Sequence, residues 1–156
     1  MSAEAPPDSL DLVLPDHAST SALGRRLGEK LAPGETICLS GGLGAGKTTL
    51  ARGAISAWTG SDDEAPSPSY TLVETYSGPR GELWHVDLYR LKGPDEVVEL
   101  GLDQAFAEAA CLIEWPERLE GALPRDRLDI VLSQAAPGRR AALTAHGVWR
   151  QKLATI

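Results

Sequence analysis

The sequence of 156 residues is poor in cysteine and in aromatic side chains. Its two cysteines, Cys38 and Cys111, fit neither a Cys-x-x-Cys metal motif nor a disulfide framework. No stretch approaches the roughly 18 apolar residues that a membrane-spanning helix needs. The first eight residues are acidic and proline-bearing, the reverse of a secretory signal. We therefore expect a cytoplasmic protein, with both cysteines buried as small apolar side chains in a reducing compartment.

Positive charge is also scarce, because the formal net charge is −7. This disfavours a nucleic-acid binder that relies on overall positive charge, and we expect neither DNA nor a membrane as a partner. The charge is unevenly distributed: residues 1–115 carry 8 basic and 18 acidic side chains, whereas residues 116–156 carry 7 and 4. We expect any direct contact with a polyanion or an acidic partner in this basic C-terminal quarter, where Arg139 and Arg140 lie.

The overall composition is that of a globular protein, with 42% hydrophobic and 24% charged residues. The length suits one domain, and neither an internal repeat nor a dividing linker is visible. We therefore expect a single domain over residues 1–156, in which residues 1–8 form a loose N-terminal tail.

Short apolar runs alternate with amphipathic stretches along the chain. The predicted strands are 10–14, 36–39, 70–76, 82–89, 110–115, 128–132 and 141–145. The first predicted helix has Ser19 or Ser21 as its N-cap and ends near Leu31, and two further helices cover 47–58 and 94–110, the latter with a break at Gly101. Residues 61–69 are predicted to form a loop. The alternation predicts an α/β fold, with a mixed sheet flanked by helices and antiparallel additions around turns at 78–81 and 137–138.

A glycine-rich segment between the strand 36–39 and the helix 47–58 fits the pattern G-x-x-x-x-G-K-[ST] at every fixed position. Its residues are Gly41, Gly42, Leu43, Gly44, Ala45, Gly46, Lys47 and Thr48. Glycines let the backbone curl around an anion, and the start of the helix adds partial positive charge. Lys47 can bind the β- and γ-phosphates, and the Thr48 hydroxyl can bind Mg²⁺. The segment therefore predicts a P-loop NTPase-like fold.

Two acidic residues follow buried strands that we expect to end at the same edge of the sheet as this loop. Asp87 ends the run 83–87, and Glu114 ends the run 111–114. Mg²⁺ bound with phosphates is held by one or two carboxylates, so both acids are candidate ligands. His85 shares a strand face with Asp87, and we interpret it as a packed or hydrogen-bonded histidine rather than a catalytic one.

The loop that contains Ser69 and Thr71 occupies the place where many nucleotide hydrolases carry a segment that senses the γ-phosphate. Its prolines are equally consistent with a stiff surface loop. Trp115, which follows Glu114, can either stack on a nucleotide base or pack in the core.

Four segments, taken together and in order, resemble the TsaE family of small P-loop ATPases of tRNA threonylcarbamoyladenosine biosynthesis. They are GGLGAGKTT at 41–49, SPSYTLVETY at 67–76, HVDLYRL at 85–91 and IEWPER at 113–118. The resemblance spans roughly residues 19–150. The chain departs from the family pattern at Gly42, where Asp is usual, and at Ser69, where Thr is common.

The resemblance implies a role for each matched position. Lys47, Asp87 and Glu114 would be catalytic, and Thr48, Asp87 and Glu114 would hold Mg²⁺, with Glu114 either in the metal shell or positioning the attacking water. The ATP-binding set that it implies is Gly41, Gly42, Leu43, Gly44, Ala45, Gly46, Lys47, Thr48, Thr49, Ser69, Thr71, Trp115 and, near the adenine, Thr20.

The resemblance also implies a function and partners. Such a protein would bind and hydrolyse ATP while bound to a TsaD–TsaB-type complex, which itself performs the threonylcarbamoylation of adenosine 37 in tRNA. Contact with tRNA would then run mainly through that complex.

Two other functions stay open on the residues alone. One is a P-loop kinase of small molecules, and the other is a nucleotide-gated binding module with negligible turnover. A GTPase is disfavoured because the chain has neither an N-K-x-D element for guanine nor a D-x-x-G switch.

Overall fold

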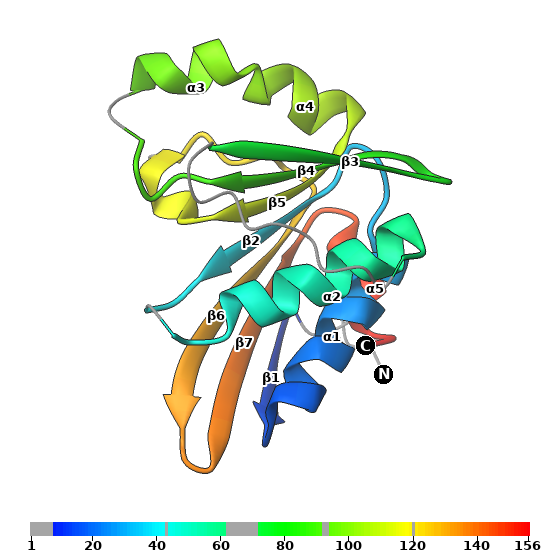
Figure 1. Cartoon of the computed structure of the whole chain (residues 1–156), viewed down its shortest axis with the longest axis vertical. Helices are drawn as coiled ribbons and strands as arrows, with labels where there is room; N and C mark the ends of the chain where they lie inside the picture. The colour runs from blue at the N-terminus through cyan, green and yellow to red at the C-terminus, as the bar shows by residue number, and fades with distance from the viewer. Residues whose placement is uncertain (1–7, 43, 62–71, 92–93, 120) are drawn as a thin grey trace, which may run out of the picture.

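A mixed β-sheet runs through the molecule, which is a computed structural model describing residues 8–42, 44–61, 72–91, 94–119 and 121–156 (Figure 1). The strands in these residues are β1 (Ser9–Leu14), β2 (Thr36–Ser40), β3 (Val73–Gly78), β4 (Gly81–Asp87), β5 (Ala110–Glu114), β6 (Arg127–Ala135) and β7 (Gly138–His146). The helices are α1 (His17–Lys30), α2 (Lys47–Thr59), α3 (Pro94–Leu100), α4 (Leu102–Glu108) and α5 (Trp149–Leu153), with a 3-10 turn, η1, at Pro116–Leu119.

The strand order is β1-β7-β6-β2-β5-β4-β3. The central strands β6, β2, β5 and β4 run parallel to one another, and the pairs β1–β7, β7–β6 and β4–β3 are antiparallel. Strands β2 and β5 are almost continuously buried, as expected for parallel strands covered on both faces. The predicted fold class, a mixed sheet flanked by helices with antiparallel additions, is confirmed.

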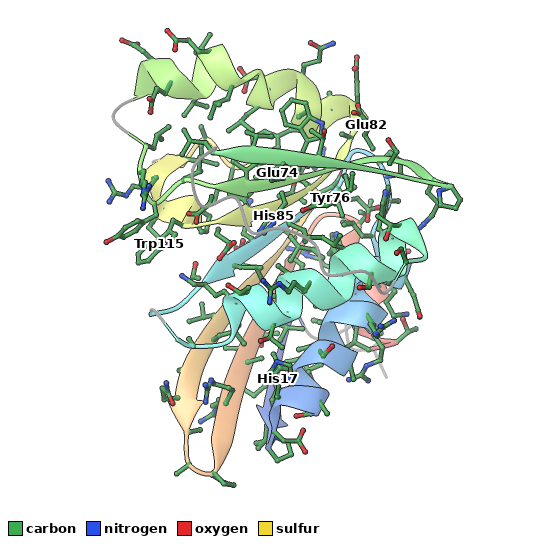
Figure 2. The ribbon with its side chains drawn as sticks, in the orientation of Figure 1. His17, Glu74, Tyr76, Glu82, His85 and Trp115 are labelled. Carbon is green, nitrogen blue, oxygen red and sulfur yellow. The ribbon has the colours of Figure 1, made fainter. Side chains whose placement is uncertain are left out.

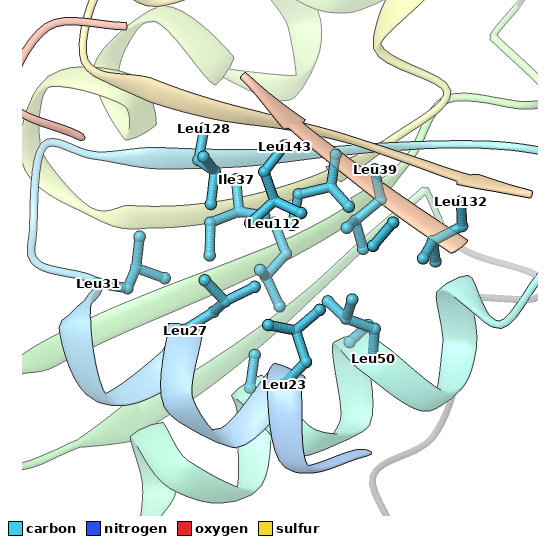
Figure 3. Packing of buried hydrophobic residues seen from close by; sticks show 14 of the residues in the cluster. Leu23, Leu27, Leu31, Ile37, Leu39, Leu50, Leu112, Leu128, Leu132 and Leu143 are labelled. Carbon is cyan, nitrogen blue, oxygen red and sulfur yellow. The ribbon is translucent and has the colours of Figure 1, made fainter. Parts of the chain in front are cut away.

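Helices cover the two faces of the sheet unequally (Figure 1). On one face, α1 and α2 lie over the sheet and bury a large leucine-rich cluster, which includes Leu27, Leu50 and Leu112 (Figure 3). On the other face, a smaller cluster is formed by β2, β4, β5, α4 and η1 and includes Cys111 and Ile113. Strands β1, β7 and β6 contribute no residue to this second cluster, so, as far as the described residues go, only one of their faces is covered by a core cluster.

Helices α1 and α2 pack with their backbones in close approach. A Cβ on Gly24 would lie 2.1 Å from the Leu50 carbonyl oxygen, and one on Gly53 would lie 2.4 Å from the Ser21 carbonyl oxygen. Only glycine fits at such positions, so these residues fix the spacing of the two helices. The start of α2, and with it the glycine-rich loop, is thereby held against α1.

The predicted N-cap of the first helix, Ser19 or Ser21, is wrong. Helix α1 begins at His17, and its N-cap is Asp16, whose carboxylate accepts a hydrogen bond from the Ser19 N–H at 2.8 Å. The Ser19 hydroxyl in turn accepts a hydrogen bond from the Asp16 N–H, which completes a capping box. The hydrogen bond that the Ser19 N–H donates to the Asp16 carboxylate lowers the pKa of Asp16. Ser19 is therefore the third residue of the helix and part of its cap, which is why it resembled a start signal.

Other expectations are confirmed or extended by the structure. The helical stretch 94–110 is broken at Gly101, which has φ 73°, and the final antiparallel pair is present but longer than predicted. Helix α5 and the turn η1 were not predicted. The tail residues 1–7 and nearly all of the predicted loop 61–69 lie outside the described residues.

Both cysteines are free and buried, as predicted, and burial raises the pKa of the Cys111 thiol to about 12. Among the described residues, no helix has the length and apolar character needed to cross a membrane.

Candidate functional site

The loop between β2 and α2 is built around glycines with backbone conformations that other residues rarely adopt. Gly41, Gly44 and Gly46 have φ values of 140°, 78° and 102°. A Cβ on Gly41 would lie 2.4 Å from the Leu132 carbonyl oxygen. The chain therefore packs closely against β6 at the point where it leaves β2 and enters the loop. Gly42 differs, since a Cβ there would meet nothing within 4 Å.

The start of α2 favours negative charge. Gly46 is its N-cap and provides no side-chain hydrogen bond, and the first turn contains no acidic residue. The first N–H groups of a helix have no partner inside the helix and carry partial positive charge. This end of α2 is therefore suited to bind an anion, as the glycine-rich motif predicts.

Lys47 is the first residue of α2, and it is almost fully buried, with 6% of its surface exposed. Its Nζ donates a hydrogen bond to the Gly41 carbonyl oxygen at 2.8 Å and lies 4.2 Å from the centroid of the Trp115 ring. A buried ammonium held by one carbonyl and a ring face retains unused N–H donors. Lys47 is thus available to bind a further acceptor at the loop.

The two predicted acids lie side by side at the carboxyl edge of the sheet. Asp87 of β4 is paired in register with Glu114 of β5, and Glu114 is paired with Leu39 of β2, which leads into the loop. Because the three strands are parallel, their ends bring both carboxylates to the same edge as the loop.

The two carboxylates differ in their surroundings. Burial raises the pKa of Asp87, and the Glu114 carboxylate raises it further, whereas the hydrogen bond that the Tyr89 N–H donates to Asp87 at 3.0 Å lowers it. Glu114 is 5% exposed, and its Oε2 lies 2.8 Å from Nε2 of His85. Since a carboxylate can only accept, the His85 Nε2–H donates to Glu114.

His85 is buried in the sheet, and Trp115 lies at the end of β5 (Figure 2). Trp115 has φ 60°, in the left-handed region that is uncommon for a residue other than glycine. Its ring lies 5.0 Å from that of Tyr89, at an interplanar angle of 46°. Strained backbone of this kind is concentrated at functional sites.

Two adjoining cavities are formed here. The larger, of about 320 Å³, is lined by Lys47, Thr48, Asp87, Glu114, Trp115 and Arg139, among others. The second, of about 180 Å³, is lined by residues of the α1 start, the α2 start and the β6–β7 turn, including Thr20, Thr49 and Pro137. Larger cavities lie elsewhere on the surface, but none of their lining residues belongs to the glycine-rich loop or to the two strand ends.

The profile of the family described as "Threonylcarbamoyl adenosine biosynthesis protein TsaE" matches residues 14–142, most of the chain. The chain belongs to the TsaE family.

Individual relatives agree with this assignment. The tRNA threonylcarbamoyladenosine biosynthesis protein TsaE of Haemophilus influenzae is 40% identical over 75% of this chain and 77% of its own length. The TsaE protein of Bacillus subtilis is 36% identical over 78% of this chain and 75% of its own length. The crystal structure of Bacillus subtilis YdiB superposes with a TM-score of 0.72 at 30% identity, and the match covers 94% of this chain and 90% of that one.

Most of the site residues expected from the sequence lie together. Of the residues that the TsaE resemblance implied, those lining the larger cavity are Gly44, Gly46, Lys47, Thr48, Thr49, Asp87, Glu114 and Trp115. Thr20 is not among them and lines the second cavity. Ala45 is buried in the core cluster, and Gly41 and Gly42 shape the loop without lining either cavity. Leu43, Ser69 and Thr71 lie outside the described residues.

Three residues gain a place in the site that sequence reasoning did not give them. Tyr89 is part of the HVDLYRL segment, so the family resemblance of that segment could have identified it as a site residue. His85 is hydrogen-bonded, as predicted, but its partner is Glu114. Arg139 was assigned only to the basic quarter, and no local pattern connects it to a loop some 95 positions away.

Proposed function

We propose that this chain is an Mg²⁺-dependent ATPase, a single P-loop domain of the TsaE family that acts in the cytoplasm on a TsaD–TsaB-type complex during tRNA threonylcarbamoylation. The observation that carries the proposal is the register between β4, β5 and β2. It brings two carboxylates to the cavity that the loop, Lys47 and Thr48 also line.

The phosphates of ATP would lie along the loop. The N–H groups at the start of α2 and the ammonium of Lys47 would hold them. Lys47 is buried and already oriented by Gly41 and Trp115, so little side-chain freedom is lost when it binds an anion.

The oxygen donors of the site fit Mg²⁺. Thr48 supplies a hydroxyl, and Asp87 and Glu114 supply carboxylates, all at the larger cavity. Within the described residues, no group of three or more His, Cys, Asp and Glu side chains forms a metal cage of its own. Mg²⁺ is commonly held by one or two carboxylates together with substrate phosphates and water, so the set suits an ion that arrives with ATP. When bound, Mg²⁺ would neutralise charge on the phosphates.

Glu114 is the group best suited to orient the attacking water. Its Oε2 accepts from His85, which leaves Oε1 to accept a hydrogen bond from water. The oxygen of that water would form a bond to the γ-phosphorus while the bond to the β–γ bridging oxygen breaks, giving ADP and phosphate. His85 would act as a positioning residue that fixes the Glu114 side chain.

The nucleoside end of ATP would occupy the second cavity, beside Thr20 and Thr49. This cavity adjoins the larger one through Gly46, Thr49 and Arg139, which line both. A molecule with a phosphate chain and a ring system could therefore bridge the two.

Within the described residues, four of the seven basic side chains of the C-terminal quarter are held in ion pairs. Three of these pairs join the quarter to acidic residues of segment 1–115, namely Arg140–Asp11, Arg150–Asp8 and Lys152–Glu35, and the fourth, Arg127–Asp129, lies within the quarter. This supports a role in which the partner complex, and not this chain, binds most of the tRNA.

The proposal is tested by measuring ATP hydrolysis by the purified chain, alone and with a cognate TsaD–TsaB-type complex and tRNA. We expect Mg²⁺-dependent hydrolysis that rises in the complex, together with threonylcarbamoylated tRNA only when all components are present. A screen of phosphoryl acceptors in the same assay covers the kinase alternative. Transfer to a small molecule would contradict the proposal, and so would normal tRNA modification without turnover of ATP.

A further inference from the structure

Arg139 lies beside the glycine-rich loop, although it comes from the far end of the chain. It is the second residue of β7, directly after the turn that joins β6 and β7 (Figure 1). Its Nη2 donates a hydrogen bond to the Gly44 carbonyl oxygen at 3.0 Å, and its Nη1 donates to Oε1 of Gln134 at 3.3 Å. A Cβ on Gly46 would lie 3.8 Å from its Nε. The guanidinium group thus lies against the loop at the N-cap of α2.

One donor of this group is unused. Nε of Arg139 is buried and has no hydrogen-bond partner among the described residues. A buried N–H without an acceptor is unfavourable, and more so when the group is charged, so such atoms are rare unless a ligand or water supplies the acceptor. Because this atom lies beside a loop that is suited to bind an anion, its position indicates that an anion supplies the missing acceptor.

The two cavities meet at this side chain. Arg139 lines the larger cavity with Lys47 and also the second cavity with Thr20. Lys47 and the two carboxylates belong only to the larger one. A group at the junction faces the part of a ligand that connects a ring system to the end of its phosphate chain.

The neighbouring arginine provides an internal contrast. Arg140 points to the opposite face of the strand, as alternate residues do, and is exposed. Its only ion pair in the described residues is with Asp11, at 3.5 Å between two side chains that are each more than half exposed. Two adjacent arginines of the basic quarter therefore have different surroundings, and only one of them reaches the loop.

We propose that Arg139 is a further nucleotide-binding residue, whose guanidinium group binds the α- and β-phosphates of ATP and ADP from the β6–β7 side of the loop. This rests on the proposed function. Lys47 approaches from the side of β5 and Trp115, so the two cations flank the phosphate chain. A planar guanidinium group can donate two parallel hydrogen bonds to phosphate oxygens, which an ammonium cannot.

The test compares the affinities of the Arg139→Gln and Arg140→Gln variants for ATP, ADP and adenosine by isothermal titration calorimetry, with adenosine measured by competition. We expect Arg139→Gln to weaken ATP and ADP by a similar factor, about 10- to 100-fold, and to leave adenosine within about twofold. Arg140→Gln should bind all three within about twofold of the unmodified chain. Arg139→Lys, which keeps the charge but not the planar donors, should lie between the two.

Three results would overturn the proposal. They are unchanged ADP affinity in Arg139→Gln, an equal loss for adenosine, and a loss confined to ATP, which would place the group at the γ-phosphate instead. Thermal unfolding without nucleotide shows whether Arg139→Gln is folded. If it is not, Arg139→Lys decides by the same criteria. Because ADP binding needs no hydrolysis, a chain that binds ADP through Arg139 but never turns over ATP would contradict the proposed function and leave this inference standing.

Discussion

The two halves of the sheet are built differently. Strands β2, β5 and β4 are packed between helices on both faces, whereas β6, β7 and β1 are covered by α1 and α2 on one face and present Val13, Val131 and Arg140 on the other. The doubly covered half carries the two carboxylates at its strand ends. Among the described residues, Arg139 of the β6–β7 hairpin is the one side chain that the half covered on one face contributes to the larger cavity.

This difference explains why candidate site residues can be recognised from the sequence in one half of the sheet but not in the other. In the doubly covered half, β4 and β5 each end directly in an acidic candidate site residue, so strand and acid are recognised together. In the other half, polar and apolar residues alternate along β6 and β7, so an arginine that lies at the loop resembles any solvent-facing charge. Substitutions in each half of the sheet test this difference.

The largest effect is expected at the strand end of the doubly covered half. Glu114→Gln removes the charge that would orient and deprotonate water but keeps a similar shape and an acceptor for His85. We expect kcat for ATP hydrolysis to fall about 100- to 10,000-fold, with nucleotide affinity changed only a few-fold. Steady-state kinetics together with calorimetric binding measures both. A kcat within threefold of the original would assign Glu114 a structural role.

Core substitutions test whether the doubly covered half also provides most of the stability. Leu112 of β5 is fully buried in the main cluster, so Leu112→Ala should lower the free energy of unfolding by about 2–5 kcal/mol. Val131 on the open face of β6 is 49% exposed, and Val131→Thr should change the free energy of unfolding by about 0.5 kcal/mol or less. Urea denaturation of the two variants gives both values. Equal losses would mean that the open face is covered in solution.

A smaller effect on turnover is expected at His85. His85→Phe removes the donor to Glu114, and we expect kcat to fall about tenfold with little change in nucleotide affinity. His85→Gln provides an amide N–H of similar reach and should recover most of the activity. If His85→Gln is as slow as His85→Phe, although both unfold at the same temperature, the imidazole itself would be required.

The sequence predicted most of the fold because its elements are marked locally. The runs before Asp87 and Glu114, the glycine-rich loop and the break at Gly101 all signal structure within a few residues. The start of α1 was misplaced because Asp16, Ser19 and Ser21 are all acceptable cap residues. Which of them caps the helix depends on where β1 ends.

What could not be predicted depends on contacts between distant segments. The antiparallel pairing of β1 with β7 joins opposite ends of the chain, and it places the β6–β7 turn beside the start of α1. Arg139 reaches the loop because β7 pairs with β6, and β6 pairs with β2, the strand that leads into the loop. The hydrogen bond between His85 and Glu114 likewise requires the register of β4 on β5. Such registers are set by the packing of the whole sheet.

The smallest effect is expected at Gly42, where the TsaE family resemblance led us to expect an Asp. A Cβ there meets no atom within 4 Å, and φ is not positive, so Gly42→Asp should change the free energy of unfolding by about 0.5 kcal/mol or less. Gly41→Ala is the matched contrast, since its Cβ would lie 2.4 Å from the Leu132 carbonyl oxygen, and it should cost more than about 2 kcal/mol. Thermal unfolding compares the two, and equal stabilities would contradict the loop geometry.

The central claim is that the loop, the start of α2 and the two strand ends form an ATP·Mg²⁺ site, and ATP binding by the unmodified chain and by Lys47→Ala tests it most directly. Titration in the presence of Mg²⁺, followed by calorimetry, should show saturable binding to the unmodified chain. The same titration should show binding at least about 100-fold weaker in Lys47→Ala, because the buried ammonium beside Gly41 and Trp115 is lost. Equal affinity of a folded Lys47→Ala variant for ATP, or no binding to either protein, would contradict the account.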